Sequence, residues 1–233
     1  MSTQIKAVLF DKDGTLFDFN ATWAAWAHSF LTGLCAGDES KAAFLGGAIG
    51  FDYVKKTFHP ESPVIAGTPE EIASMIGPFV DLPLPDLIAR MNDEAAIAPQ
   101  AEAVPLVPFF QHLQSLGLRT GVVTNDGEGP ARAHLHAAGA LPLLDFVAGF
   151  DSGYGAKPEP GPLLAFAEAV GLAPADVVMV GDSLHDLMAA RAAGMHAVGV
   201  LTGLAEAAIL APFADAVLPD IGALPEWLAE RNG

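Results

Sequence analysis

Asp11 and Asp13 stand two residues apart in the segment DKDGTL at positions 11–16, which follows the apolar run 7–10. A carboxylate is a competent nucleophile towards phosphorus and a hard oxygen ligand for Mg²⁺. A second carboxylate nearby can hold a proton for a leaving oxygen if its pKa is raised. Taken alone, the segment is equally well explained as an Asx-turn with a glycine, a common way to leave a strand.

Two further segments carry groups that suit a phosphate. Thr124 and Asn125 end the segment VVTN at 122–125, where a hydroxyl and an amide can donate to phosphate oxygens. Lys157 lies in the proline-stiffened segment AKPEP at 156–160, where its ammonium can pair with an aspartate and with a phosphate. Taken alone, an N-cap pair and a solvated loop lysine explain these residues better.

A second pair of acids, Asp182 and Asp186, lies in the segment VGDSLHD at 180–186. The two residues are four apart at the start of a predicted helix, so they share one face of it. Their like charges repel each other, and a divalent cation relieves that repulsion. Helix N-capping explains Asp182 well and the pair less well.

Helices and strands alternate regularly after residue 104. We predict helices at 105–116, 129–138, 161–170, 184–193, 204–210 and 221–231, and strands at 120–124, 146–149, 177–180, 196–200 and 215–218. This alternation predicts βαβ units with right-handed crossovers and a parallel sheet. Because ligands bind outside the carboxyl ends of such strands, we expect the four polar segments to meet at one edge of the sheet.

The stretch from residue 20 to 98 has a different pattern of apolar residues. Apolar side chains recur at helical spacing from Trp23 onward, further amphipathic segments follow at 41–58, 69–80 and 84–96, and no strand is predicted. The stretch separates the first strand, 7–10, from its partners. The fold class is therefore α/β, a Rossmann-like parallel sheet with an all-helical domain inserted after its first strand. We expect the core at 1–17 and 99–233 and the inserted domain at 18–98.

Composition restricts the kind of partner. The net charge of −17, with only 11 lysines and arginines, argues against nucleic-acid binding. Positive charge for a phosphate must come locally, from a metal ion, a lysine and backbone N–H groups. The sequence shows neither a signal peptide nor a run of about 20 apolar residues, so we expect no membrane association. The single cysteine, Cys35, favours a reducing compartment, and we expect a cytoplasmic protein.

Together, the segments DKDGTL, VVTN, AKPEP and VGDSLHD resemble the haloacid dehalogenase superfamily. The resemblance implies that Asp11 attacks the phosphorus of a phosphomonoester, while Asp13 protonates the leaving alcohol and then activates water. It implies that Thr124 and Asn125 hold phosphate oxygens and that Lys157 offsets negative charge. These roles agree with phosphoryl-transfer chemistry, in which positioning and charge stabilisation dominate.

The same resemblance implies a magnesium site. Its ligands would be Asp11, the backbone carbonyl of Asp13, and Asp182. Asp186 would bind the metal through a water molecule or would support the residues that bind it directly. The dehalogenases lack an acid two residues after the nucleophile, so Asp13 favours phosphoryl chemistry. The helical insertion resembles the mobile cap of phosphoglycolate-phosphatase-like members. The expected substrate is therefore a small phosphomonoester such as phosphoglycolate, and the expected assembly is a monomer or homodimer.

Three alternatives remain open. A phosphomutase similar to β-phosphoglucomutase would use the same Asp11 and Asp13 but return the phosphoryl group to a sugar. A phosphonate hydrolase would need a cap lysine for a Schiff base, for which Lys41, Lys55 and Lys56 are candidates. A non-catalytic binding protein on the same fold would usually have lost one of the acids.

Two residues depart from the family pattern. Lys12 stands where an apolar residue is common between the two aspartates, and Asp126 stands where relatives often carry a lysine. An aspartate in place of a lysine at position 126 weakens the positive electrostatic field around the expected phosphate site. No metal site is predicted among the histidines. His185 is expected to be a spacer, and Trp23 and Trp26 are expected to pack inside the cap.

Overall fold

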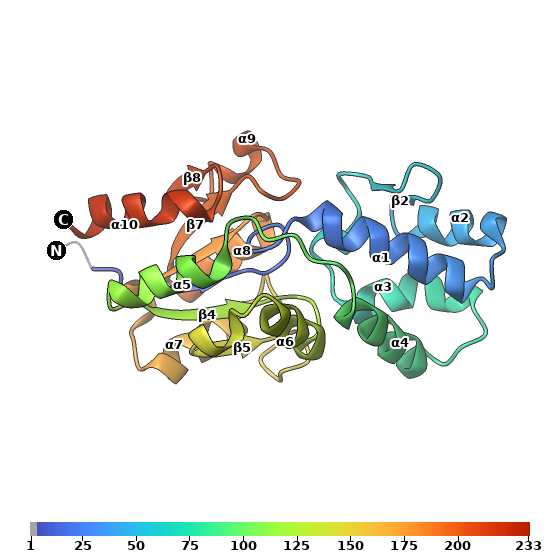
Figure 1. Cartoon of the computed structure of the whole chain (residues 1–233), viewed down its shortest axis with the longest axis horizontal. Coiled ribbons are helices and arrows are strands. Elements are labelled where there is room, and N and C mark those ends of the chain that lie inside the picture. Colours follow the sequence, from blue (N-terminus) through green and yellow to red (C-terminus); the bar gives the residue numbers. More distant parts are fainter. Residues whose placement is uncertain (1–3) are drawn as a thin grey trace.

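The structure is a computed structural model, and it describes residues 4–233. A six-stranded parallel sheet forms its centre, in the order β5-β4-β1-β6-β7-β8 (Figure 1). The strands are β1 (Ala7–Phe10), β4 (Arg119–Val123), β5 (Phe146–Ala148), β6 (Val177–Gly181), β7 (His196–Val200) and β8 (Ala216–Leu218). Numbered along the chain, these six strands lie in the order 3-2-1-4-5-6, which is the doubly wound Rossmann-like arrangement. The predicted fold class is confirmed.

The central strand β1 explains why the chain begins with a continuous apolar run. Its residues are fully buried because helices cover both faces of a parallel sheet. Phe10 lies opposite Val122 of β4 and opposite Val180 of β6. All three strands therefore end at the same level, and the residues that follow them emerge at one edge of the sheet.

Helices cover the two faces of the sheet. On one face lie α5 (Leu106–Ser115), α6 (Glu128–Ala137) and α10 (Leu224–Asn232), and on the other lie α7 (Gly161–Val170), α8 (Leu184–Ala193) and α9 (Ala207–Leu210). Val8 and Phe10 belong to the first hydrophobic cluster, whereas Ala7 and Leu9 belong to the second. This alternation is the two-residue period of a strand buried on both sides.

A separate group of helices lies beside the sheet, on the right in Figure 1. It contains α1 (Phe19–Leu34), α2 (Glu39–Ala48), α3 (Pro69–Ile76), α4 (Leu84–Ala96) and a hairpin of β2 (Phe51–Asp52) with β3 (Thr57–Phe58). We call residues 19–96 the cap. The cap has its own hydrophobic cluster, which includes the buried Cys35. The domain limits of 18 and 98 stay a prediction.

The predicted helix at 41–58 is wrong in its second half. Helix α2 ends at Ala48, and Gly50 has a left-handed φ of +68° that turns the chain away. The side chain of Asp52 then accepts hydrogen bonds from the backbone N–H groups of Val54 and Lys55, at 3.1 and 2.9 Å. This side-chain turn closes the β2–β3 hairpin, so the cap is helical apart from these two short strands.

Smaller differences concern the ends of elements. Helix α9 begins at Ala207, three residues after the predicted start, and the last predicted helix opens with a short 3₁₀ turn. Such turns occupy Pro63–Ile65, Gly77–Phe79, Leu141–Leu143, Pro174–Asp176 and Ile221–Ala223. Within residues 4–233, none of the helices is both long enough and apolar enough to cross a bilayer.

The two connections between core and cap run side by side. Phe17 pairs with Glu102 in an isolated β-bridge, and Asp18 N–H donates to the carbonyl of Ala101 at 2.8 Å. The backbone N–H of Ala103 donates to the carbonyl of Leu16 at 2.9 Å. Any movement of the cap relative to the sheet therefore requires these two paired connections to bend.

Candidate active site

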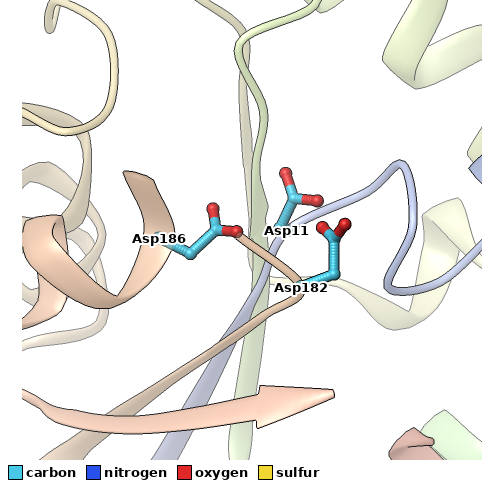
Figure 2. Close-up of side chains that lie close together, drawn as sticks. All are labelled: Asp11, Asp182 and Asp186. Atoms are coloured by element: carbon cyan, nitrogen blue, oxygen red, sulfur yellow. The ribbon is translucent and has the colours of Figure 1, made fainter. Parts of the chain in front are cut away.

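Three predicted acids meet at the carboxyl edge of the sheet. Asp11 follows β1, Asp182 follows β6 and Asp186 lies in the first turn of α8. Each offers a carboxylate oxygen within 4.8 Å of the other two, and all three side chains are buried (Figure 2). The order of the strands reverses between β1 and β6, because β4 and β5 follow on one side and β7 and β8 on the other. Ligands usually bind at such a reversal point in these folds.

Lys157 lies among these acids and is not a solvated loop lysine. Its Nζ is 2.5 Å from Oδ1 of Asp11 and 2.7 Å from Oδ1 of Asp186, and it also donates to the carbonyl of Val123 at 3.0 Å. An ammonium has three protons to donate, and these three acceptors use all of them. The position of the ammonium is therefore fixed from three directions.

Asn125 holds the loop that carries Lys157. Its Oδ1 accepts the backbone N–H of Lys157 at 2.9 Å, and its Nδ2 donates to the Lys157 carbonyl at 2.8 Å. The same Nδ2 donates to the carbonyl of Ala66 in the cap, also at 2.8 Å. The amide is thus engaged with backbone on both sides, and its predicted contact with phosphate stays a prediction.

Asp186 is held by the start of its own helix. Its Oδ2 accepts from the backbone N–H of Ser183 at 3.0 Å and from the Ser183 hydroxyl at 2.7 Å. This is a capping box with aspartate in the place of glutamate. Since Oδ1 accepts from Lys157, the carboxylate joins the start of α8 to the lysine. The three-residue spacing of Ser183 and Asp186 is a local sequence signal for this contact.

Two glycines allow the backbone to approach Asp182. Gly14 has a φ of +84°, and a Cβ at Gly14 or at Gly203 would collide with the Asp182 carboxylate. Thr202 fixes this approach, because its hydroxyl donates to the carbonyl of Gly14 at 2.6 Å. Thr202 and Gly203 lie nearly 190 residues from Gly14 in sequence, and no local pattern points to them.

Asp13 and Thr124 line the same pocket as Asp11. The Thr124 hydroxyl accepts the backbone N–H of Asp126 at 3.1 Å, which leaves its own proton to donate. The pocket therefore presents a carboxylate, a hydroxyl and an ammonium beside Asp11. His185 lines the pocket too, and its expected role as a spacer stays a prediction.

The two departures from the family pattern contact each other. Lys12 is fully buried, and its Nζ lies 2.8 Å from Oδ2 of Asp13 and 3.0 Å from Oδ2 of Asp126. The Nδ1 of His134 is also 3.0 Å from this ammonium. Since the His134 Nε2 contacts the carbonyl of Ala95 at 2.7 Å, Nε2 carries the proton and Nδ1 accepts from Lys12. The pairing of Lys12 with Asp126 and its contact with His134 join segments more than 100 residues apart, and no local sequence pattern predicts them.

Burial dominates the electrostatics of the acidic cluster. It raises the pKa of Asp11 to about 7, against the opposing effect of Lys157 and with a further increase from Asp186 and Asp13. Burial and the nearby Asp11 and Asp186 also raise the pKa of Asp182 well above its usual range. For Lys157, burial favours the neutral amine, but Asp11 and Asp186 outweigh it and raise the pKa.

The Lys12 cluster shows the same competition. Burial favours loss of the Lys12 proton, but the carboxylates of Asp13 and Asp126 outweigh it and raise the pKa. Burial, together with the neighbouring Lys12 charge, lowers the pKa of His134 to about 4. Around neutral pH, the cluster therefore contains the Lys12 ammonium and a neutral His134 imidazole.

The chain matches a known family over most of its length. Residues 5–194 match the model of the haloacid dehalogenase-like hydrolases. The chain belongs to this family. It is 40% identical over 117 residues to a phosphoglycolate phosphatase from Rhodospirillum rubrum, a match that covers 50% of this chain and 48% of that relative. The chain thus spans about half the length of this relative.

A longer match supports the same family. A phosphoglycolate phosphatase from Xylella fastidiosa is 32% identical over 204 residues, covering 85% of this chain and 81% of the relative. Among solved structures, a predicted phosphoglycolate phosphatase from Haemophilus somnus has a TM-score of 0.75 at 20% identity, covering 97% of this chain and 99% of that one. The similarity to that structure shows the fold.

Proposed function

We propose that the protein is a magnesium-dependent phosphatase that hydrolyses a small-molecule phosphomonoester through an aspartyl-phosphate on Asp11. The observation that carries this proposal is the position of the Asp11 carboxylate, held by Lys157 in a buried acidic cluster at the edge of a pocket. Asp13 and Thr124 line that pocket as well. The names of the relatives support a phosphatase and make phosphoglycolate the first substrate to test.

The acidic cluster suits a divalent cation. Asp11, Asp182 and Asp186 would carry three negative charges when ionised, and Lys157 supplies one positive charge, which leaves two negative charges in a buried space. Burial is the main cause of the raised pKa values of Asp11 and Asp182, and the neighbouring carboxylates raise them further. An all-oxygen donor set favours Mg²⁺, which would be held by Asp11, Asp182 and the backbone carbonyl of Asp13. When bound, Mg²⁺ neutralises charge on the phosphoryl oxygens.

The side chains of the pocket divide the reaction between them. An oxygen of Asp11 attacks phosphorus, the bond from phosphorus to the alcohol oxygen breaks, and Asp13 gives its proton to that oxygen. Asp13 then takes a proton from water, the water oxygen attacks phosphorus, and phosphate leaves with Asp11 restored. Thr124 donates to a phosphoryl oxygen, and Lys157 offsets the charge that Asp11 and the phosphoryl group share.

The phosphonate-hydrolase alternative has little support in the cap. Lys41, Lys55 and Lys56 are all exposed, and none of them lines the pocket formed by the described residues. A phosphomutase would use the same Asp11 and Asp13, so it is distinguished by activity. It would transfer the phosphoryl group between positions of a sugar and release phosphate slowly. The cytoplasmic location and the monomeric or homodimeric state stay predictions.

The test is phosphate release from p-nitrophenyl phosphate and a panel of metabolite phosphates, with Mg²⁺ and with EDTA. We expect release that requires Mg²⁺ and that Asp11→Asn abolishes. Asp81→Asn, the same change at an exposed residue outside the pocket, is the matched control and should behave as wild type. Metal-independent release, or full activity of Asp11→Asn, would contradict the proposal.

A further inference from the structure

The part of the pocket wall that the cap supplies is apolar. It includes Phe19, Trp23, Trp26, Ile65, Ile72 and Met91. Among the described residues, the cap contributes neither a lysine nor an arginine nor a carboxylate to this wall. Among the residues that the structure describes, the titratable side chains of the pocket come from the core, and Lys157 and His185 are the basic ones. The two walls therefore differ sharply in polarity.

Trp26, one of the residues of this wall, contains a buried polar atom. The residue is only 5% exposed, and its indole Nε1 is buried with no hydrogen-bond partner among the described residues. The ring is held by Trp23, edge to face at 5.2 Å between centroids, and by Phe30, stacked at 5.1 Å. A buried indole N–H normally has an acceptor. The packing thus fixes an N–H donor that an acceptor from outside the chain would satisfy.

Asn92 adds a second group of this kind. It lines the same pocket from α4, and its Oδ1 is also buried without a partner in the part of the chain that the structure describes. Buried polar groups left without partners destabilise a protein, so both atoms indicate a molecule that supplies hydrogen bonds here. One donor and one acceptor together match an uncharged hydroxyl or amide, which can both accept and donate.

We propose that the alcohol part of the substrate is mainly apolar and carries an uncharged hydroxyl or amide that bonds with Trp26 and Asn92. The inference rests on the proposed phosphatase function and names the substrate class for that site. A carboxylate in this position would lose its hydration against an apolar wall that offers no cation. Lys157 cannot readily replace that hydration, because its three protons are already bonded to Asp11, Asp186 and Val123.

A matched series of esters tests this substrate class on the wild-type enzyme with Mg²⁺. The probes are 2-phenylethyl phosphate and its ring derivatives with a hydroxyl or a carboxylate at each ring position, together with phosphoglycolate. All share a primary alkyl leaving group. We expect the best hydroxyl isomer to exceed the unsubstituted ester in kcat/KM by about threefold or more. We expect each carboxylate isomer and phosphoglycolate to fall below the unsubstituted ester by about tenfold or more.

Trp26→Phe removes the N–H and keeps an aromatic ring. We expect this variant to lose the preference for the hydroxyl isomer, measured as the ratio of kcat/KM for the hydroxyl isomer to kcat/KM for 2-phenylethyl phosphate in the same protein. Trp227→Phe makes the same change in α10, outside the pocket, and should keep that preference. Circular dichroism checks that both variants are folded, and the wild-type series stands without them. A hydroxyl preference that survives in folded Trp26→Phe would overturn the role of the indole.

The outcomes separate the two levels of inference. Turnover that favours phosphoglycolate or a carboxylate isomer would overturn the apolar substrate class while leaving the phosphatase function in place. Failure of the wild-type enzyme to hydrolyse any ester, including p-nitrophenyl phosphate, would overturn the phosphatase function and this inference with it. Turnover that favours the hydroxyl isomer, and depends on Trp26, would support both.

Discussion

Lys12 is a fully buried lysine whose ammonium lies between the carboxylates of Asp13 and Asp126 and the imidazole of His134. These contacts make Lys12 the centre of a charged cluster. Lys12 lies beside the proposed acid and base, Asp13, which couples the cluster to the pocket. We therefore expect the residues of this cluster to be coupled, so that each one stabilises the fold only while its partners are present.

Removing one charge of the cluster tests that unit. Lys12→Met leaves Asp126 buried without its cation, and we expect this to lower the free energy of unfolding by about 3–5 kcal/mol. In the double variant Lys12→Met with Asp126→Asn, the loss of unfolding free energy should be smaller than the sum of the losses in the two single variants, by about 1–3 kcal/mol. Urea unfolding of all four proteins measures this coupling. Strict additivity would show that the two residues do not stabilise each other.

His134 gives the cluster a pH dependence. Its pKa is lowered from 6.5 to about 4, so between these values the unfolded chain binds the extra proton. The contribution of His134 to stability is therefore complete above pH 6.5 and is lost as the pH falls towards 4. Between pH 7 and 5 we expect wild type to lose about 1–2 kcal/mol more than His134→Gln.

Denaturant unfolding at the two pH values measures the difference. His112→Gln, a change at an exposed histidine of α5, is the control and should lose as much stability as wild type. Equal losses in wild type and His134→Gln would mean that His134 is not held neutral by its surroundings.

At the scale of elements, the Lys157 loop depends on Asn125. The amide bonds to the backbone of Lys157 in both directions and to the cap carbonyl of Ala66. Asn125→Ala removes all three contacts, and we expect kcat/KM for p-nitrophenyl phosphate to fall by about 10–100-fold as Lys157 loses its fixed position.

The matched control is Asn232→Ala. Asn232 also bonds to a backbone segment in both directions, through the N–H and carbonyl of Ile5, but it lies far from the pocket. We expect this variant to lose stability without losing activity. If Asn125→Ala stays folded and fully active, the amide does not position the lysine.

The elements that could be predicted from the sequence are those fixed by local patterns. The strand 7–10 is a continuous apolar run because helices bury it on both faces, and the polar segments that follow β1, β4 and β6 meet because these strands end in register. The β2–β3 hairpin was missed because its strands have two residues each and depend on the Asp52 turn. Contacts across the fold, such as those of Thr202 and His134, have no local sequence signal.

At the scale of the whole molecule, the site lies where the cap meets the sheet edge, and the two paired connections near Phe17 and Glu102 join these parts. The core supplies the charged chemistry, and the cap supplies an apolar wall. The net charge of −17 surrounds this site with a repulsive field for anionic esters. The local cations and the proposed metal must therefore overcome a long-range repulsion.

Ionic strength tests this field. Salt screens repulsion between the protein and a doubly charged ester, so kcat/KM should rise as KCl increases from about 0.01 to 0.15 M at fixed Mg²⁺. Sucrose at matched osmolality is the control and should have no such effect. A fall in kcat/KM with salt would show that the approach to the site is attractive, and that local positive charge outweighs the net charge.

The central claim is that Asp11 carries the phosphoryl group, and trapping that intermediate tests it most directly. Asp13→Asn should still accept the phosphoryl group from p-nitrophenyl phosphate, whose leaving group needs little protonation, but should hydrolyse the intermediate slowly. After an acid quench and borohydride reduction, mass analysis of the peptide that contains residue 11 should find homoserine in place of Asp11. A burst of p-nitrophenolate with Asp11 unmodified, or with the phosphoryl group on another residue, would contradict the account.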